Sequence, residues 1–265
     1  MNSEYSVLMS VYAKENPKFL AQAIESMLGQ SVSTDDFVLV CDGPMTKELE
    51  SVIAKYPLKV FRLKQNRGLA VALNFGLQFC KHDVIARMDS DDISAPDRIA
   101  RQLKLMSEYD IVGGWAEEFK DAPGDLGLIR KTPELEIERF ARRRNPFSHP
   151  TVMFRRSIIQ NAGGYSKEFP LIEDYHLWTR LLLSGVRGYN ISKVLVYMRI
   201  GNGLYKRRSG WKYFKNMLRF RKWHRLIGFS SKLDYVVCAV SHAISCLSFG
   251  FVRDWLYIRG LRDRR

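Results

Sequence analysis

Residues 83–102 read DVIARMDSDDISAPDRIARQ, a strand-like segment that runs directly into a cluster of acids. The first seven residues have the length and apolar content of a buried β-strand. Extended spacing after it places Asp89 and Asp91 on one side of the chain and Asp92 on the other. Two carboxylates at a strand end suit Mg²⁺ or Mn²⁺ that bridges to phosphates, although Asp-Ser-Asp-Asp is also ordinary turn chemistry.

Three similar strand-like segments precede this one, and helix-like segments lie between them. Apolar strands joined by short helical crossovers predict an α/β fold with a doubly wound, mostly parallel sheet. Ligands of such sheets bind beyond the carboxyl ends of the strands, which is where Asp42 and Asp89 lie. The predicted strands are 6–12 (SVLMSVY), 37–42 (FVLVCD), 58–63 (LKVFRL) and 83–89.

The alternation weakens after residue 116, and no internal repeat or low-complexity linker occurs. Periodicity still predicts several elements there. They are a strand at 110–115, a loop over 117–127, a basic helix over 134–143, a strand at 151–156, a helix over 174–184 and a β-rich stretch over 189–200.

The composition of this 265-residue chain is that of a globular protein, with 46% hydrophobic and 26% charged residues. The first residues lack the layout of a signal peptide, and the four cysteines share no close spacing. Zinc and redox motifs are therefore not expected, and a reduced cytoplasmic setting is the default expectation.

The net charge of +14 is unevenly distributed along the chain. Residues 201–265 contain 15 Lys or Arg against 3 Asp, whereas residues 1–200 are nearly neutral. We therefore expect a catalytic domain over 1–203 and a basic, amphipathic helical tail over 204–265. Such asymmetry suggests an anionic membrane surface or a nucleic acid as partner.

Two segments of the tail have helical patterns that suit a membrane surface. A helix over 211–227 would place Lys212, Lys215, Arg219 and Lys222 on one stripe and most apolar residues opposite. Residues 235–252 carry no charged residue, but their serines fall along one face, so an interfacial helix is favoured over a spanning one. The alternative is that both helices simply pack on the catalytic domain.

Several common nucleotide motifs are missing: the sequence has no G-x-G-x-x-G after the first strand and no P-loop. Asp42, at the end of the second strand, could accept a hydrogen bond from a base or ribose. Arg67 and Gly68 precede a helix whose N-terminus suits a phosphate. Each of these could equally be turn chemistry.

The pair Glu173-Asp174 begins a helix with an apolar side. Acids in a first helical turn complement the helix dipole, and a carboxylate in a partly enclosed pocket can also act as a general base. His149 in its polar loop suits a structural role, or contact with a substrate. The run Arg142–Arg144 suits a solvated helix face, or contact with a lipid diphosphate.

Taken together and in this order, these motifs resemble those of family 2 glycosyltransferases, which have the GT-A fold. The resemblance extends from about Tyr5 to Met198. It rests on SVLMSVY, VLVCDGP, NRGLAVALNFGL, ARMDSDDISAPDRIARQ, SHPTVMFRRS, GGY and EDYHLWTRLL.

The resemblance implies transfer of a sugar from a nucleotide diphosphate donor, expected to be UDP-linked, with inversion at the anomeric carbon. The cofactor implied is a divalent metal, Mg²⁺ or Mn²⁺. The implied roles are Ser10 and Tyr12 in the nucleotide site, Asp42 on the base, Arg67 and Gly68 near the nucleotide, Asp89 on the ribose or metal, Asp91 as the principal metal ligand, and Asp174 as catalytic base.

The sequence departs from the family pattern at two places. Ala13 stands where many relatives have Asn, with the contribution of Glu15 left open, and Cys-Asp-Gly-Pro replaces Asp-Asp-Gly-Ser around Asp42. The Gln-x-x-Arg-Trp motif and membrane spans of processive synthases are missing, which favours addition of a single sugar.

The leading hypothesis is a transferase that builds bacterial polysaccharide repeat units on a lipid-linked acceptor, peripheral on the inner face of the cell membrane. One alternative is a soluble or protein acceptor. Another is a nucleic-acid-binding protein that uses basic and aromatic residues over 205–225. No recognised nucleic-acid module frames those residues, so no nucleic-acid partner is expected.

Overall fold

The computed structural model describes residues 4–201, 209–247 and 263–264. Its first half confirms the predicted alternation of strands and helices. The four strands are parallel in the spatial order β3-β2-β1-β4. They are β1 (Tyr5–Val11), β2 (Asp36–Cys41), β3 (Lys59–Arg62) and β4 (Val84–Met88), with helices α1 (Pro17–Leu28), α2 (Lys47–Ile53) and α3 (Leu69–Leu77) between them.

The second half continues the same sheet mainly with antiparallel pairs. The full path over the described residues is β10-β7-β6-β8-β4-β1-β2-β3, and β9 pairs with both β5 and β6. Parallel pairing is therefore confined to β1–β4 and to β6 with β9. The added strands are β5 (Ile93–Ser94), β6 (Ile111–Phe119), β7 (Leu128–Arg130), β8 (Met153–Arg155), β9 (Gly188–Arg199) and β10 (Asp263–Arg264).

Some predicted boundaries in this half are wrong. Residues 117–119 are not loop but the end of β6, because Glu117 and Glu118 pair with β7 and β9 and are buried. The strand predicted at 151–156 is reduced to β8 by a 3-10 turn over His149–Thr151. The basic helix is limited to α5 (Ile137–Ala141).

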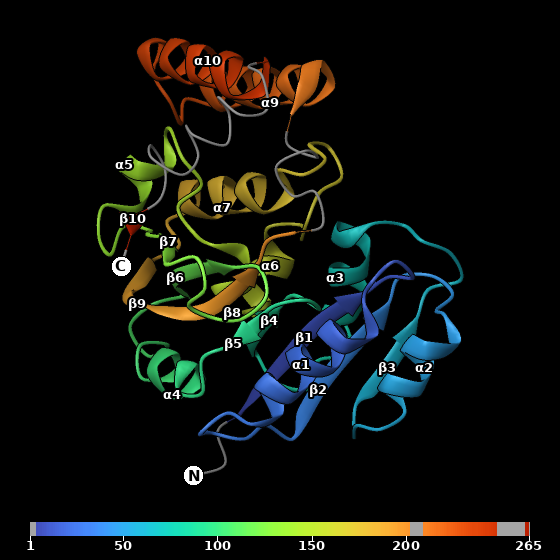
Figure 1. Ribbon diagram of the computed structural model, residues 1–265. Helices are drawn as coiled ribbons and strands as arrows, with labels where there is room; N and C mark the ends of the chain where they lie inside the picture. Colours follow the sequence, from blue (N-terminus) through green and yellow to red (C-terminus); the bar gives the residue numbers. More distant parts are fainter. Residues whose placement is uncertain (1–3, 202–208, 248–262, 265) are drawn as a thin grey trace.

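Helices cover both faces of the sheet (Figure 1). On one side α1, α2 and α4 (Arg98–Leu103) pack their apolar residues against β1 and β2. On the other side lie α3, α6 (Arg156–Asn161) and α7 (Glu173–Leu183), with Trp178 of α7 fully buried. This three-layer arrangement brings the carboxyl ends of β1, β2 and β4 to one edge of the sheet.

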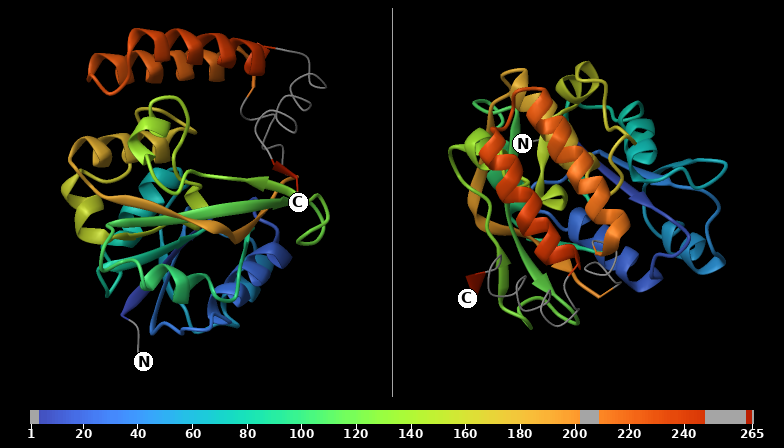
Figure 2. Two further views of the ribbon diagram at one scale, coloured as in Figure 1. Left: turned by 90° about the vertical axis from the view of Figure 1, so that its left-hand side faces the viewer. Right: turned by 90° about the horizontal axis from the view of Figure 1, so that it is seen from above.

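The C-terminal helices α9 (Gly210–Leu226) and α10 (Lys232–Leu247) form a further layer over α7 (Figure 2). The apolar side of α9 faces the protein, because Met217 and Phe220 pack with Phe169 and Tyr175. His224 of α9 also contacts the Thr179 hydroxyl of α7 at 2.8 Å. Phe214, Met217 and Phe220 are therefore not available to lipid, which corrects the expectation that this side as a whole enters the headgroup region, although Trp211 is 58% exposed.

Helix α10, in contrast to α9, exposes a stripe of apolar side chains to solvent. Leu233, Val236, Val240 and Ile244 form that stripe, while Cys238 and Cys246 are buried on the other side. The prediction for 235–252 reaches beyond α10, and residues 248–252 lie outside the described chain. Within the described chain, no helix combines the length and the apolar character that crossing a membrane requires.

Candidate active site

The acidic motif after β4 is anchored by a buried arginine. Arg87, in the strand itself, is 1% exposed, and its guanidinium donates to both carboxylate oxygens of Asp89. The Nη1–Oδ2 distance is 2.7 Å. Such a two-pronged ion pair fixes the orientation of the carboxylate as well as its position. The structure thus places Asp89 rigidly at the end of the strand.

Arg98, at the start of α4, supports this end of β4. Arg98 is fully buried and donates through Nη2 to the carbonyl oxygens of Arg87, at 2.8 Å, and Val152, at 3.2 Å. Burial, and then the neighbouring charge of Arg87, lower the pKa of Arg98 to about 9. Gln102 joins the same group by donating to the carbonyls of Val112 and Thr151.

Asp91 and Asp92 are held by Arg199 at the end of β9. The backbone N–H of Arg199 donates to Asp92 Oδ1 at 2.8 Å, and its Nε donates to the Asp91 carbonyl at 3.0 Å. Burial, and then the charges of Asp89 and Glu15, raise the pKa of Asp91 to about 7. The ionised form of Asp91 is therefore disfavoured in the protein alone.

Glu15 belongs to this cluster, which answers the question that the sequence left open. Its Oε2 accepts a hydrogen bond from the Ser90 hydroxyl at 2.7 Å, and its Oε1 accepts one from the Asn16 N–H at 2.8 Å. The loop after β1 is thereby tied to the acidic motif after β4.

The carboxylates fit a hard divalent cation in one respect: a cation would relieve the mutual repulsion that raises the pKa of Asp91. Both oxygens of Asp89 already accept from Arg87, which leaves Asp91 as the principal candidate ligand. Over the described residues, no group of three or more His, Cys, Asp or Glu side chains is arranged to hold a metal. A metal here would depend on substrate phosphates for most of its ligands.

The second predicted group lies at the ends of β1 and β2. Asp42 accepts hydrogen bonds from the backbone N–H groups of Arg67, at 2.7 Å, and Gly68, at 2.9 Å. Gly43 must be glycine, since its φ is +97° and a Cβ would lie 2.7 Å from the Asn66 nitrogen. The structure therefore brings three predicted residues, Asp42, Arg67 and Gly68, into direct contact.

Ser10 and Tyr12 lie beside this group. Ser10 of β1 pairs in register with Val40 of β2, and Tyr12 follows the end of β1. The Tyr12 side chain is 39% exposed, as a residue that contacts a bound base could be.

Asp174 begins α7 and has two hydrogen-bond partners. Its Oδ1 accepts from the Tyr175 backbone N–H at 2.8 Å, and its Oδ2 accepts from the Asn145 amide at 2.7 Å. The first contact satisfies an N–H of the first helical turn, whereas the second orients the carboxylate toward the loop after α5. Both predicted roles, helix cap and base, are compatible with this geometry.

Tyr165 connects the Asp174 region to the acidic motif. Burial raises the pKa of its hydroxyl, and the charges of both Asp174 and Asp89 act in the same direction, opposed by Arg87. Asn74 of α3 holds the tyrosine in place through two 2.8 Å hydrogen bonds to its backbone. Its hydroxyl contacts His149 Nε2 at 3.1 Å, the structural role expected for that histidine. The charges of Asp89 and Asp174 therefore both act on one buried side chain.

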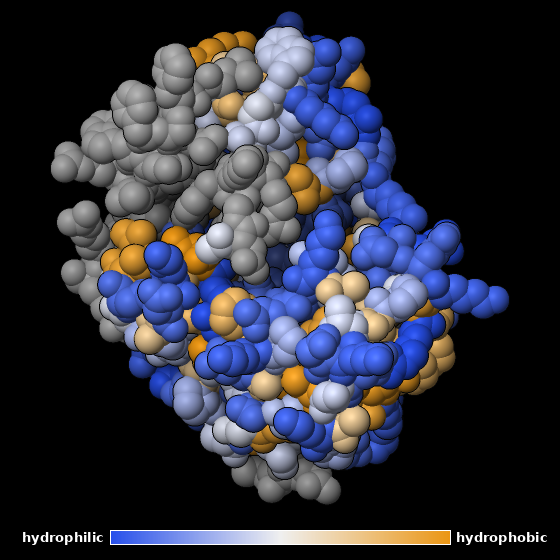
Figure 3. Space-filling view, turned by 45° about the vertical axis from the view of Figure 1, so that its right-hand side comes forward, coloured by the Kyte–Doolittle hydropathy of each residue, from blue (hydrophilic) through white to orange (hydrophobic). Residues whose placement is uncertain are grey.

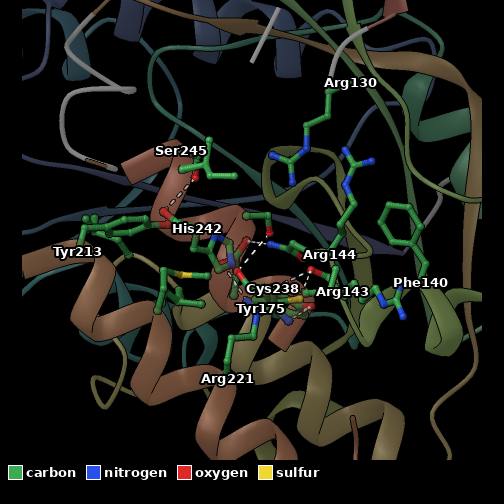
Figure 4. A pocket seen from close by; sticks show the side chains of 18 of the residues that line it. Arg130, Phe140, Arg143, Arg144, Tyr175, Tyr213, Arg221, Cys238, His242 and Ser245 are labelled. Atoms are coloured by element: carbon green, nitrogen blue, oxygen red, sulfur yellow. Dashed lines mark hydrogen bonds between the residues drawn. The ribbon is translucent and has the colours of Figure 1, made fainter. Parts of the chain in front are cut away.

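A pocket of about 550 Å³ opens beside Asp174 (Figure 4). Its wall combines the end of β7, the loop after α5, the start of α7 and the inner sides of α9 and α10. Basic and apolar side chains dominate its lining. The residues that line the pocket include Arg130, Lys131, Arg143, Arg144, Asp174, Tyr213, Met217, Arg221, Val237 and Ile244.

Sequence reasoning missed several residues of this site. The signal for Arg87 was available, since it is a charged residue within an apolar strand. Arg199, Asn145 and Asn74 gave no local signal, because each acts on a residue at least 29 positions away.

The comparisons with known proteins identify the family and the fold. The family model described as Glycosyl transferase family 2 matches residues 6–163. The UDP-Gal:alpha-D-GlcNAc-diphosphoundecaprenol beta-1,3-galactosyltransferase of Escherichia coli is 37% identical over 98% of this chain and 97% of its own. The amylovoran biosynthesis glycosyltransferase AmsE of Erwinia amylovora is 38% identical over 80% of this chain and 82% of its own.

Among solved structures, S. aureus TarS 1-349 in complex with UDP-GlcNAc matches with a TM-score of 0.65 at 19% sequence identity. The match covers 82% of this chain and 65% of that one. It confirms the expected GT-A-type α/β fold. The family match over more than half of the chain, and the identity to the E. coli protein over nearly all of both chains, show that this protein belongs to glycosyl transferase family 2.

Proposed function

We propose that this protein transfers a single sugar, with inversion, from a UDP-linked donor to a hydroxyl of a lipid-linked glycan in polysaccharide biosynthesis. The observation that carries the proposal is the position of Asp174 in the wall of a pocket, with its carboxylate oriented by Asn145. The names of the two bacterial relatives support the acceptor class and the process.

In this proposal the donor nucleotide binds at the ends of β1 and β2. The loop fixed by Asp42, Arg67 and Gly68 receives the base and ribose, and the start of α3 offers backbone N–H groups to a phosphate. Asp91, helped by Asp89, would hold a divalent ion. Such an ion supplies positive charge that offsets the charge developing on the leaving diphosphate.

Asp174 then acts as the base. Asn145 orients its carboxylate, and the acceptor hydroxyl loses its proton to Asp174 as the oxygen attacks the anomeric carbon. One displacement from the face opposite the leaving group inverts the configuration and needs no nucleophile from the protein.

We also propose that the outer layer of α9 and α10 holds the protein at a membrane surface. Exposed basic residues of α9 and the exposed apolar stripe of α10 support this, and these two helices form the outer layer in Figure 2. Figure 3 shows hydrophobic surface next to hydrophilic surface at the top of the molecule. Basic residues near anionic lipid each contribute about 1 kcal/mol, and apolar residues add burial in the interface.

The first prediction concerns Asp91→Asn. Loss of the carboxylate charge should weaken metal-dependent donor binding and transfer together, by at least about tenfold. UDP-Gal with a GlcNAc-diphosphate-lipid acceptor is a suitable assay. Asp97→Asn is the matched control, since that acid pairs with Arg101 outside the site. Full activity in excess chelator, or equal effects of the two changes, would contradict the metal role.

The second prediction concerns Asp174→Asn, which keeps the shape but cannot accept the proton. In the same assay kcat should fall by roughly 10²–10⁴ while the KM for the nucleotide sugar holds. Glu48→Gln removes a first-turn acid from α2 and controls for helix capping. If Asp174→Asn lowers only the melting temperature, Asp174 is a helix cap and not the base.

The third prediction tests the membrane surface. Val236→Ser combined with Val240→Ser should weaken binding to vesicles that contain anionic phospholipid by about tenfold, because apolar area is lost from the interface. Binding of the unaltered protein should also fall as salt rises. Leu135→Ser with Leu183→Ser changes equally exposed residues elsewhere. Equal binding by both double variants would rule out this surface.

A further inference from the structure

The proposed function assigns no role to the basic and apolar side chains that line the 550 Å³ pocket. We propose that it binds the lipid diphosphate part of the acceptor, with Arg130 and Arg144 holding the phosphates and α10 receiving the beginning of the lipid chain. This inference rests on the proposed function for its choice of ligand, and on the lining of the pocket for everything else.

The pocket is distinct from the expected donor site. None of Ser10, Asp42, Arg67, Asp89 or Asp91 lines it. Asp174 does line it, so a sugar attached to a ligand in this pocket would lie beside the proposed base. The volume is within the range of small-molecule sites. These properties suit the acceptor rather than the nucleotide.

The charge of the lining favours an anion. Five cationic side chains line the pocket, and Asp174 is the one carboxylate among the lining residues that the structure describes. Arginine guanidinium groups bind phosphate oxygens in pairs and are preferred where phosphate is recognised. A diphosphate, with several oxygens and at least two negative charges, matches this excess of positive charge.

Two of these cationic side chains form contacts that stabilise the wall of the pocket. Arg143 forms an ion pair with Asp234 at the start of α10, and Arg221 donates to the carbonyls of Arg142 and Arg143 and to the Tyr175 hydroxyl. They fix the wall of the pocket and join the C-terminal layer to the catalytic domain.

Arg130 and Arg144 have the position that a phosphate ligand requires. Arg130 ends β7, and Arg144 lies in the loop after α5, with its guanidinium 5.3 Å from the centre of the Phe140 ring. In the view of Figure 4, Arg130 lies at the top, Arg144 lies below it, and Arg221 lies at the opposite, lower side. An arginine that stacks on an aromatic ring does so through the face of its planar guanidinium.

The other wall of the pocket is apolar and leads to the surface. Val237 and Ile244 of α10 line the pocket together with Met217 of α9. The apolar stripe of α10 continues from them outward through Val236 and Val240, both 55% exposed. A basic inner end and an apolar exit along one helix match a diphosphate that carries a long hydrocarbon chain, and the chain would continue into the membrane beside α10.

The test is direct binding, which needs no catalysis. Binding of farnesyl diphosphate is measured by calorimetry for the full chain and for Arg130→Gln with Arg144→Gln. The double change should weaken binding at least tenfold, because charge-assisted hydrogen bonds to phosphate are lost. Arg142→Gln is the matched control, since this neighbouring arginine pairs with Glu138 and does not line the pocket. UDP binding should be the same in all three proteins.

Farnesol, which lacks the diphosphate, should bind weakly to the unaltered protein and equally to the double variant. The inference is overturned if the double change weakens farnesyl diphosphate binding no more than Arg142→Gln does, or if farnesol and the diphosphate bind alike. Failure of the proposed function is a separate result. In that case the predicted binding pattern is found, but no sugar reaches a GlcNAc-diphosphate-lipid acceptor.

Discussion

The ion pair between Arg87 and Asp89 is the constraint on which the rest of the site depends. A guanidinium that is 1% exposed is costly to bury, and the Asp89 carboxylate compensates for it at the end of β4. Removal of Asp89 would leave the buried Arg87 guanidinium without its carboxylate partner. The acidic motif is therefore more than a solvated turn, since one of its acids pairs with a buried guanidinium of the strand that carries it.

The remaining contacts place the other functional groups relative to this pair. Glu15 and Arg199 connect the motif to the loop after β1 and to β9, and the charges of Asp89 and Asp174 both act on the buried Tyr165. We propose that one active site has two halves. The first half is formed by the ends of β1, β2 and β4, and the second is the pocket beside Asp174. A donor in one half and an acceptor hydroxyl in the other would meet near Tyr165.

The sequence predicted the first half of the fold well, because each element there carries its own periodicity and its own caps. Asn16 caps α1 through the Lys18 N–H, as its position before Pro17 indicates. Short elements of the second half depend on tertiary pairing, which is why 117–119 and the bounds of the strand at 151–156 were predicted wrongly. The pattern of 211–227 identified an apolar side but not its partner, and that partner is α7. The pocket combines segments from 130 to 245 and has no local signature.

The most direct measurement of the central claim is the anomeric configuration of the transferred sugar, read by NMR of the product made from a UDP-sugar of known configuration. A single displacement between the two halves of the site predicts the opposite configuration in the product. Retained configuration would contradict it, because retention requires a second displacement or attack from the face of the leaving group. It would also remove the reason for a base at Asp174.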